Sequence, residues 1–241
     1  MSLLKIEKIS KYFGGLAAVK ELDLVVDEGE ILGMIGPNGA GKTTAFNVIS
    51  GFYKPDSGRV IFADEDITGL RPDQICKKGI ARTFQVVKPF AQLRVLDNVI
   101  VGALSRTSNV SRARSKAQDV LAFLQMSALE DQLAGSLPIA SRKRLGVAKA
   151  LATEPKVILL DEAMSGLRPT ESQEMIELVR RIRERGITVL LVEHVMKVIM
   201  SLADRIIVLH HGEKIAEGQP QNIVQDKAVI DAYLGEVKTD A

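Results

Sequence analysis

Cysteine, long apolar runs and an excess of charge of one sign are all scarce in this 241-residue sequence. The single cysteine, Cys76, cannot form a disulfide within the chain and has no second thiol beside it for a metal site. No uninterrupted apolar run approaches the roughly 18 residues of a membrane-spanning helix. Basic residues number 32 and acidic residues 30, so the formal net charge of +2 creates no overall field that attracts nucleic acid. These features fit a reducing compartment, and we expect the chain to stay in the cytosol unless a partner holds it at a membrane.

Apolar residues make up 46% of the chain, enough to bury the core of one large or two small domains. Apolar and polar residues alternate over 4–9 and 22–26, which predicts half-buried antiparallel strands separated by a glycine-containing turn at 11–15. Continuous apolar runs at 157–160 and 187–192 alternate with helical patterns. They predict a parallel sheet that is covered by helices on both faces.

The segment 72–137 has a different pattern, because helical periods run through it and no part of it is a convincing strand. We therefore expect a helical lobe inserted into an α/β body that comprises residues 1–71 and 138–241. The last residues, 235–241, are expected to form a frayed tail.

The strongest motif is a phosphate-binding loop. Residues 36–43 fit the template G-x-x-x-x-G-K-[ST], between a strand candidate at 31–35 and a helical pattern at 45–50. Glycines let the backbone bend around phosphates, so that N–H groups converge on the phosphate oxygens at the positive end of the following helix. Lys42 is expected to reach the β- and γ-phosphates, and the Thr43 hydroxyl to be a ligand of Mg²⁺. The predicted nucleotide-binding residues of this loop are Gly36, Pro37, Asn38, Gly39, Ala40, Gly41, Lys42, Thr43 and Thr44.

Two carboxylates, Asp161 and Glu162, follow the apolar run 157–160. A parallel sheet presents its ligand-binding residues at this end of its strands. Asp161 can hold the hydration shell of Mg²⁺, and Glu162 can polarise the attacking water or accept its proton. A strand that ends in two surface acids by chance is the alternative, and the phosphate loop upstream favours the functional interpretation.

Three further side chains are candidates for the same site. Gln85 lies where the body meets the lobe, and its amide could touch both Mg²⁺ and water; an ordinary solvated loop glutamine is the alternative. His194 directly follows the run 187–192, although a lone histidine is more often structural. Phe13 could stack on a base or could cap the small sheet, and the residues leave both open.

In this order, the motifs make the chain similar, over essentially its whole length, to the ATP-binding-cassette (ABC) ATPases. The chain looks most like the nucleotide-binding subunits of bacterial importers of branched-chain amino acids and similar small polar solutes. Four segments carry this narrower resemblance: Lys11-Tyr-Phe-Gly-Gly-Leu-Ala-Ala-Val19, Gly51-Phe-Tyr-Lys-Pro55, Ala81-Arg-Thr-Phe-Gln85 and Val192-Glu-His-Val-Met-Lys197. The resemblance implies a P-loop cassette fold over 1–241, with an N-terminal antiparallel β-subdomain and the inserted lobe at 72–137.

The resemblance also implies ATP and Mg²⁺ as cofactors and assigns roles to the candidates. Phe13, with its neighbour Tyr12 as a fallback, is the ring that stacks on adenine. The catalytic residues that it implies are Lys42, Gln85, Glu162 and His194. The resemblance also implies that Thr43, Gln85 and Asp161 bind the metal.

In this family two subunits pair head to tail, and the signature segment of one faces the ATP of the other. The segment here is Leu137-Pro-Ile-Ala-Ser141 in place of the usual L-S-G-G-Q. We expect Ile139, Ala140 and Ser141 to contact nucleotide across the dimer. Ala140 has a Cβ where glycine would allow positive φ and close approach, whereas Ser141 is expected to cap a helix beginning near Arg142. We predict an active but slow ATPase.

The partners implied are transmembrane permease subunits, a second ABC ATPase subunit that is identical or related, and indirectly an external solute-binding protein. No nucleic acid is expected. The protein would be peripheral, on the cytoplasmic face of the inner membrane. The expected docking surface is the groove near 85–98, where apolar side chains either receive a partner helix or belong to the core: Val86, Val87, Phe90, Leu93 and Val95.

Two other functions stay open on the sequence. A soluble cassette ATPase could act on nucleic acid or ribosomes, but the basic stretch 106–116 has no interleaved aromatic residues and is interpreted as a solvated helix face. A regulatory ATP binder with a degenerate signature would have lost turnover. Steady ATP hydrolysis would distinguish a transporter subunit from such a regulatory ATP binder.

Overall fold

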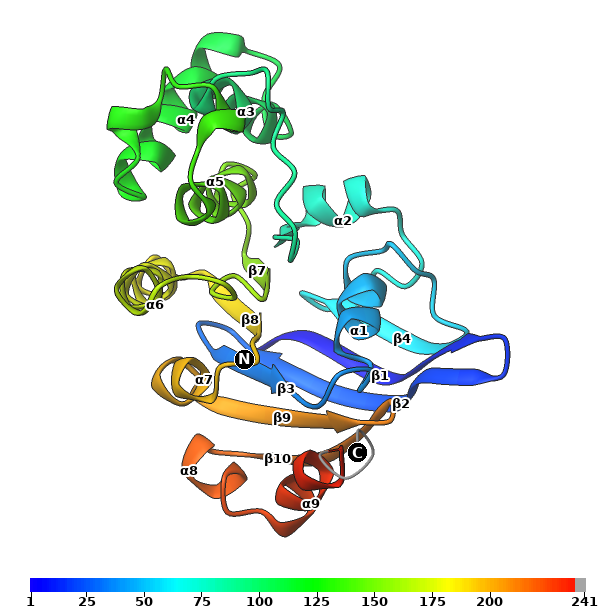
Figure 1. Cartoon of the computed structure of the whole chain (residues 1–241). Helices are drawn as coiled ribbons and strands as arrows, with labels where there is room; N and C mark the ends of the chain where they lie inside the picture. The colour runs from blue at the N-terminus through cyan, green and yellow to red at the C-terminus, as the bar shows by residue number, and fades with distance from the viewer. Residues whose placement is uncertain (237–241) are drawn as a thin grey trace.

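The computed structural model describes residues 1–236, whose strands form a four-stranded and a six-stranded sheet (Figure 1). The strands are β1 (Ser2–Phe13), β2 (Leu16–Asp27), β3 (Ile31–Ile35), β4 (Ser57–Phe62), β5 (Glu65–Asp66), β6 (Ile80–Arg82), β7 (Val157–Asp161), β8 (Thr188–Val192), β9 (Arg205–His210) and β10 (Glu213–Gly218). The α-helices are α1 (Lys42–Ile49), α2 (Pro72–Lys78), α3 (Val95–Ala103), α4 (Val110–Phe123), α5 (Ile139–Leu151), α6 (Pro169–Glu184), α7 (Met196–Leu202), α8 (Pro220–Ile223) and α9 (Lys227–Glu236). Short 3-10 helices occupy Ser127–Leu129 and Ala134–Ser136.

The smaller sheet is antiparallel and has the strand order β2-β1-β4-β5, which confirms the predicted β-subdomain. Its alternating apolar residues, such as Leu4 and Leu24, are buried on one face. The turn predicted at 11–15 is shorter than expected. Residues 11–13 continue to pair with β2, and the chain reverses only at Gly14, whose φ is +58°.

The larger sheet has the order β10-β9-β3-β8-β7-β6, and only the pairing of β10 with β9 is antiparallel among the described residues. Every residue of β3, β7 and β8 is buried, as the continuous apolar runs predict. Residues of β3 belong to two different hydrophobic cores. Ile31 and Ile35 pack in the core that includes residues of α3, α4 and α5, whereas Leu32 and Met34 pack in the core that includes residues of α1 and the smaller sheet. The parallel strands end at one edge, and the chain segments that carry the candidate residues leave from that edge.

The helical lobe consists of α3 and α4, which Figure 1 places far from the two sheets, with α5 between the lobe and the body. Buried residues of α3, α4 and α5 share one hydrophobic core. The expectation of no strand within 72–137 is wrong, because β6 pairs in parallel with β7 at the edge of the larger sheet. Ile75 of α2 and Ile80 of β6 belong to the core beneath the smaller sheet.

Three helices, α5, α7 and α9, differ from what the sequence predicts. Ser141 does not cap a helix: α5 begins at Ile139, and Pro138 is its N-cap residue without a side-chain hydrogen bond. Helix α7 was not predicted, because its seven residues span only two turns. Of the expected tail at 235–241, Gly235 lies within α9, and 237–241 lie outside the described residues. Within 1–236, none of the helices has the length and apolar character needed to cross a membrane.

Candidate nucleotide and metal site

The phosphate loop connects β3 to α1, and its conformation requires glycine. Gly36 has a φ of +149°, and a Cβ at this position would lie 2.1 Å from the backbone oxygen of Leu209. Gly41 has a φ of +102°, and its Cβ would lie 2.3 Å from the backbone oxygen of Ala18. A side chain at either position would therefore combine backbone strain with overlap against a neighbouring strand.

Lys42 holds the loop in shape. Its Nζ donates hydrogen bonds to the backbone oxygens of Gly36 at 2.6 Å and Pro37 at 2.7 Å. Helix α1 begins at Lys42 and has no acidic residue in its first turn, so nothing there opposes an anion at the positive end of the helix. Thr43 is exposed and Thr44 is half-buried at this end.

A cavity of about 500 Å³ lies in front of the loop, which is within the usual range for small-molecule sites. Its lining comes from the β1–β2 hairpin, the phosphate loop and the segments that follow β6, β7, β8 and β9. The lining residues are Phe13, Leu16, Ala17, Ala18, Asn38, Gly39, Ala40, Gly41, Lys42, Thr43, Thr44, Gln85, Glu162, His194 and His211. The cavity thus brings together residues that lie up to about 200 positions apart in the sequence.

Phe13 lies at the hairpin end of this cavity, and the residue is 44% exposed. The ring packs edge-on against Tyr53 with centroids 5.2 Å apart, so one aromatic neighbour fixes its position. Tyr12 does not belong to the lining, and its backbone N–H donates to Asp56 Oδ2 at 2.7 Å. Of the two candidate rings, Phe13 is the one that can meet a ligand in the cavity.

Glu162 lies at the centre of a three-residue cluster. Gln85 donates from Nε2 to Glu162 Oε2 at 2.6 Å, and His194 Nε2 lies 2.6 Å from Glu162 Oε1. The backbone of Glu162 has a φ of +48°, an unusual value for a residue with a side chain. Such strain is common at functional sites. The sequence predicted these three side chains separately, and the structure joins them at one carboxylate.

Asp161 lies behind this cluster and is not part of the cavity lining. Its Oδ2 accepts a hydrogen bond from Arg82 Nη2 at 2.8 Å, and both side chains are buried. In residues 1–236, no group of three or more His, Cys, Asp or Glu side chains could hold a metal alone. When bound, Mg²⁺ would keep several waters and be held through one or two carboxylates together with substrate phosphates. The oxygen donors present, the Thr43 hydroxyl and the Asp161 carboxylate, are of the type that Mg²⁺ prefers.

Two charged residues near Glu162 were not predicted from the sequence. Lys143 Nζ donates to the backbone oxygen of Glu162 at 2.6 Å, and burial lowers the pKa of this half-buried amine. Glu193 is buried, and its Oε1 accepts a hydrogen bond from the backbone N–H of Met164 at 2.7 Å. Burial raises the pKa of Glu193 to about 7. No local motif marks either residue, because each acts through a fold-dependent contact.

The signature segment lies elsewhere on the surface. Ile139 is 60% exposed, and Ala140 and Ser141 are half-buried at the start of α5. None of the three lines the cavity of its own chain. The backbone at Ala140 is helical and does not have a positive φ, so glycine is not required there for conformation.

The fold and the phosphate-loop cavity define a P-loop nucleotide-binding cassette. A family model described as "ABC transporter" matches residues 19–165, and the chain belongs to this family. A second model, described as "Branched-chain amino acid ATP-binding cassette transporter", matches residues 213–239. The protein is therefore an ATPase subunit that binds nucleotide and energises a membrane transporter.

Curated relatives are similar over nearly the whole chain. The high-affinity branched-chain amino acid transport ATP-binding protein LivG of Escherichia coli is 38% identical, and the alignment covers 97% of this chain and 98% of LivG. The protein BraF of Pseudomonas aeruginosa, which has the same description, is 36% identical with the same coverage. A probable LivG of Methanocaldococcus jannaschii is 34% identical over 98% of both chains.

Solved structures agree with this assignment. An ATP-binding cassette of an ABC transporter in its ADP conformation superposes with a TM-score of 0.89 at 34% identity, covering 98% of this chain and 99% of that one. A dimeric cassette in a post-hydrolysis state, bound to ADP and Pi, superposes with a TM-score of 0.82 at 26% identity, covering 90% of this chain and 99% of that one. The predicted fold class is confirmed.

Proposed function

We propose that this chain is the ATP-hydrolysing subunit of an importer for branched-chain amino acids or similar small polar solutes. The observation that carries the proposal is the Glu162 carboxylate, which Gln85 and His194 hold at a cavity that the phosphate loop also lines. The solute class is supported by the C-terminal family match and by the relatives, which are described as branched-chain amino acid transport proteins. These relatives do not favour a soluble ATPase that acts on nucleic acid or ribosomes.

The cavity supports a role for each of its residues. Residues 36–44 bind the phosphates through backbone N–H groups and through Lys42, which donates to the loop here and can also reach phosphate oxygens. Phe13 stacks on the adenine ring. Thr43, Gln85 and Asp161 would hold Mg²⁺ or its water shell. When bound, the metal neutralises charge on the β- and γ-phosphates.

Hydrolysis then depends on Glu162 and its two neighbours. The carboxylate accepts a hydrogen bond from the attacking water and polarises it toward the γ-phosphorus. Gln85 and His194 orient the carboxylate, and His194 also faces the terminal phosphate. The Glu162 side chain is largely buried, which lowers competition from bulk water for its oxygens.

A second cassette completes the site. Ile139, Ala140 and Ser141 line no part of their own cavity, and a related cassette forms a dimer. We infer that this segment, at the N-terminus of α5, closes on the γ-phosphate of the partner subunit's ATP. The partner cassette is either a second copy or a related chain. An external solute-binding protein would deliver the solute to the permease.

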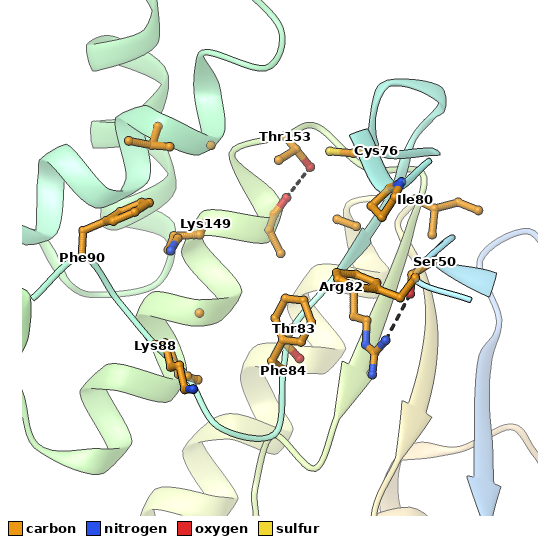
Figure 2. Close-up of a pocket in the computed structure, with 18 residues that line it drawn as sticks. Ser50, Cys76, Ile80, Arg82, Thr83, Phe84, Lys88, Phe90, Lys149 and Thr153 are labelled. Carbon is orange, nitrogen blue, oxygen red and sulfur yellow. Dashed lines mark hydrogen bonds between the residues drawn. The ribbon is translucent and has the colours of Figure 1, made fainter. Parts of the chain in front are cut away.

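The permease docks in a second cavity, of about 360 Å³, between the lobe and the body (Figure 2). Val87 and Phe90 of the predicted docking segment line it. Val86 and Leu93 are exposed beside it, whereas Val95 is fully buried in the lobe core and cannot contact a partner. The mostly apolar walls fit one face of an amphipathic helix. Docking here places the protein peripherally on the cytoplasmic face of the inner membrane.

The replacement Glu162→Gln tests the proposal, because it removes the proton acceptor and keeps the side-chain shape. ATP hydrolysis by the assembled transporter is expected to fall by about 10²- to 10⁴-fold, while ATP binding is retained. Glu177→Gln, on the exposed face of α6, is the matched control and should leave the rate unchanged. Normal turnover by Glu162→Gln would remove Glu162 from its proposed role.

The solute class needs its own measurement. Cells that lack this chain should lose uptake of radiolabelled leucine, and the wild-type chain should restore it, whereas Glu162→Gln should not. Unchanged leucine uptake, together with loss of uptake of another solute, would overturn the solute class and leave the ATPase assignment standing.

A further inference from the structure

Arg82 forms a buried ion pair with Asp161 that the proposed function does not explain. Its side chain is 6% exposed and that of Asp161 is 4% exposed. Nη2 donates to Asp161 Oδ2 at 2.8 Å, while Nη1 donates to Asn47 Oδ1 at 2.6 Å and to Ser50 Oγ at 3.1 Å. The guanidinium therefore joins the end of β7 to the C-terminal end of α1.

The other face of Arg82 reaches the docking cavity. The guanidinium carbon lies 5.2 Å from the ring centre of Phe84 and 5.8 Å from that of Phe52. These two rings pack edge to face with centroids 5.5 Å apart, and each is about half exposed. Both rings line the docking cavity, and Figure 2 shows Arg82 hydrogen-bonded to Ser50 close to Phe84. A helix that enters the cavity must contact the rings on which Arg82 rests.

We propose that Arg82 is a positioning residue that orients Asp161 for the metal and connects the docking cavity to it. This inference rests on the proposed function, because it takes Asp161 as a metal residue and this cavity as the docking site. Arg82 fixes one carboxylate oxygen of Asp161, and so it also fixes the direction of the other. Because the guanidinium is a rigid planar fork, a shift of the Phe52–Phe84 pair moves its Asp161 contact as well.

One guanidinium nitrogen of Arg82 is left without an acceptor from the part of the chain that the structure describes. Within residues 1–236, Arg82 Nε is buried and has no hydrogen-bond partner. A buried donor without an acceptor is costly, and arrangements of this kind are rare in protein interiors.

Binding of Mn²⁺, as a spectroscopic substitute for Mg²⁺, tests the inference without measuring turnover. Mn²⁺ affinity is measured by electron paramagnetic resonance on the full chain with a non-hydrolysable ATP analogue, and analogue affinity is measured separately in EDTA. Arg82→Lys keeps the charge and loses the fork, and should weaken Mn²⁺ binding by about 10-fold. Analogue affinity in EDTA should not change. Equal Mn²⁺ affinity in the wild type and Arg82→Lys would overturn the inference.

The connection to the cavity is tested by Phe84→Leu, alone and combined with Arg82→Lys. Phe84→Leu should weaken Mn²⁺ binding in the wild-type chain and have no further effect when Arg82 is replaced. Independent, additive effects would refute the connection. If Arg82→Lys does not fold, the single variants Phe52→Leu and Phe84→Leu provide the test. Each should lower Mn²⁺ affinity, and unchanged affinity in either variant would refute the connection between the cavity and the metal.

Arg181→Lys is the matched control. Like Arg82, Arg181 lies over a phenylalanine ring, that of Phe123 at 4.7 Å, and it donates to the Phe123 backbone oxygen, but it does not line the docking cavity. Its replacement should leave Mn²⁺ affinity unchanged. A wild-type chain that binds no ATP analogue would overturn the proposed function itself, whereas normal Mn²⁺ and analogue binding by Arg82→Lys overturns only the role of Arg82.

Discussion

The replacement Glu193→Gln should change how the stability of the protein depends on pH. Glu193 is 2% exposed, and one carboxylate oxygen accepts the Met164 N–H. The other oxygen, Oε2, has no hydrogen-bond partner within residues 1–236. The charged groups that act on it are Lys143, which favours the ionised form, and Glu162, which opposes it. Burial is the largest effect and raises the pKa of Glu193 to about 7.

The sign and size of the effect follow from this pKa. The pKa of Glu193 has its ordinary value of 4.5 in the unfolded chain and is about 7 in the folded chain. Between these two pH values the folded state binds more protons than the unfolded state. The free energy of unfolding therefore decreases as pH rises through this window, by about 3 kcal/mol in total from this group. Glutamine has nearly the same shape as protonated glutamate and does not ionise, so Glu193→Gln should remove this loss.

Urea unfolding at pH 5, 6, 7 and 8 measures the effect. The stability of Glu193→Gln relative to wild type should rise by about 2.5 kcal/mol from pH 5 to pH 8. Glu177→Gln, at an exposed position, should follow the wild type at every pH. A constant difference between Glu193→Gln and wild type across this range would refute the assignment of a protonated, buried Glu193.

Two further predictions concern the phosphate loop and the signature segment. Gly36→Ala should lower the free energy of unfolding by roughly 2–5 kcal/mol, because its Cβ would meet the Leu209 backbone oxygen, whereas Gly29→Ala, at positive φ but with open space around it, should cost only about 1 kcal/mol. Urea denaturation of both variants checks this, and equal losses would contradict the overlap. Ala140→Gly should raise ATP turnover of the assembled transporter by removing a methyl group at the partner's phosphate, at a stability cost of about 0.5–1 kcal/mol. An unchanged steady-state rate would show that this segment does not limit turnover.

The parts of the site that lie within one short segment were predictable from the sequence. The phosphate loop was predictable because its residues are consecutive, and the positive φ values of Gly36 and Gly41 belong to its local backbone conformation. The meeting of Glu162 and His194 was also expected in outline, since the predicted strands that precede them are parallel and end at one edge. Gln85 was expected only at the junction of body and lobe, because the strand before it, β6, was not predicted. Their direct hydrogen bonds became visible only in the structure.

The contacts that depend on side chains from several elements were not predictable. Arg82 lay inside a segment already singled out for Gln85, but nothing in the sequence indicates that it pairs with Asp161. Strand β6 was missed because its three residues are too few to show a period. The helix start at Ile139 was placed near Arg142, because a serine attracts an N-cap assignment whereas here Pro138 occupies the cap.

The central claim is that the phosphate-loop cavity holds ATP and Mg²⁺ and that Glu162 faces the terminal phosphate. A crystal structure of the Glu162→Gln variant with ATP and Mg²⁺ tests it most directly. The γ-phosphate is expected beside Lys42, with residue 162 within reach through one water and the adenine ring on Phe13. A triphosphate bound outside this cavity, or a residue 162 turned away from the γ-phosphate, would contradict it.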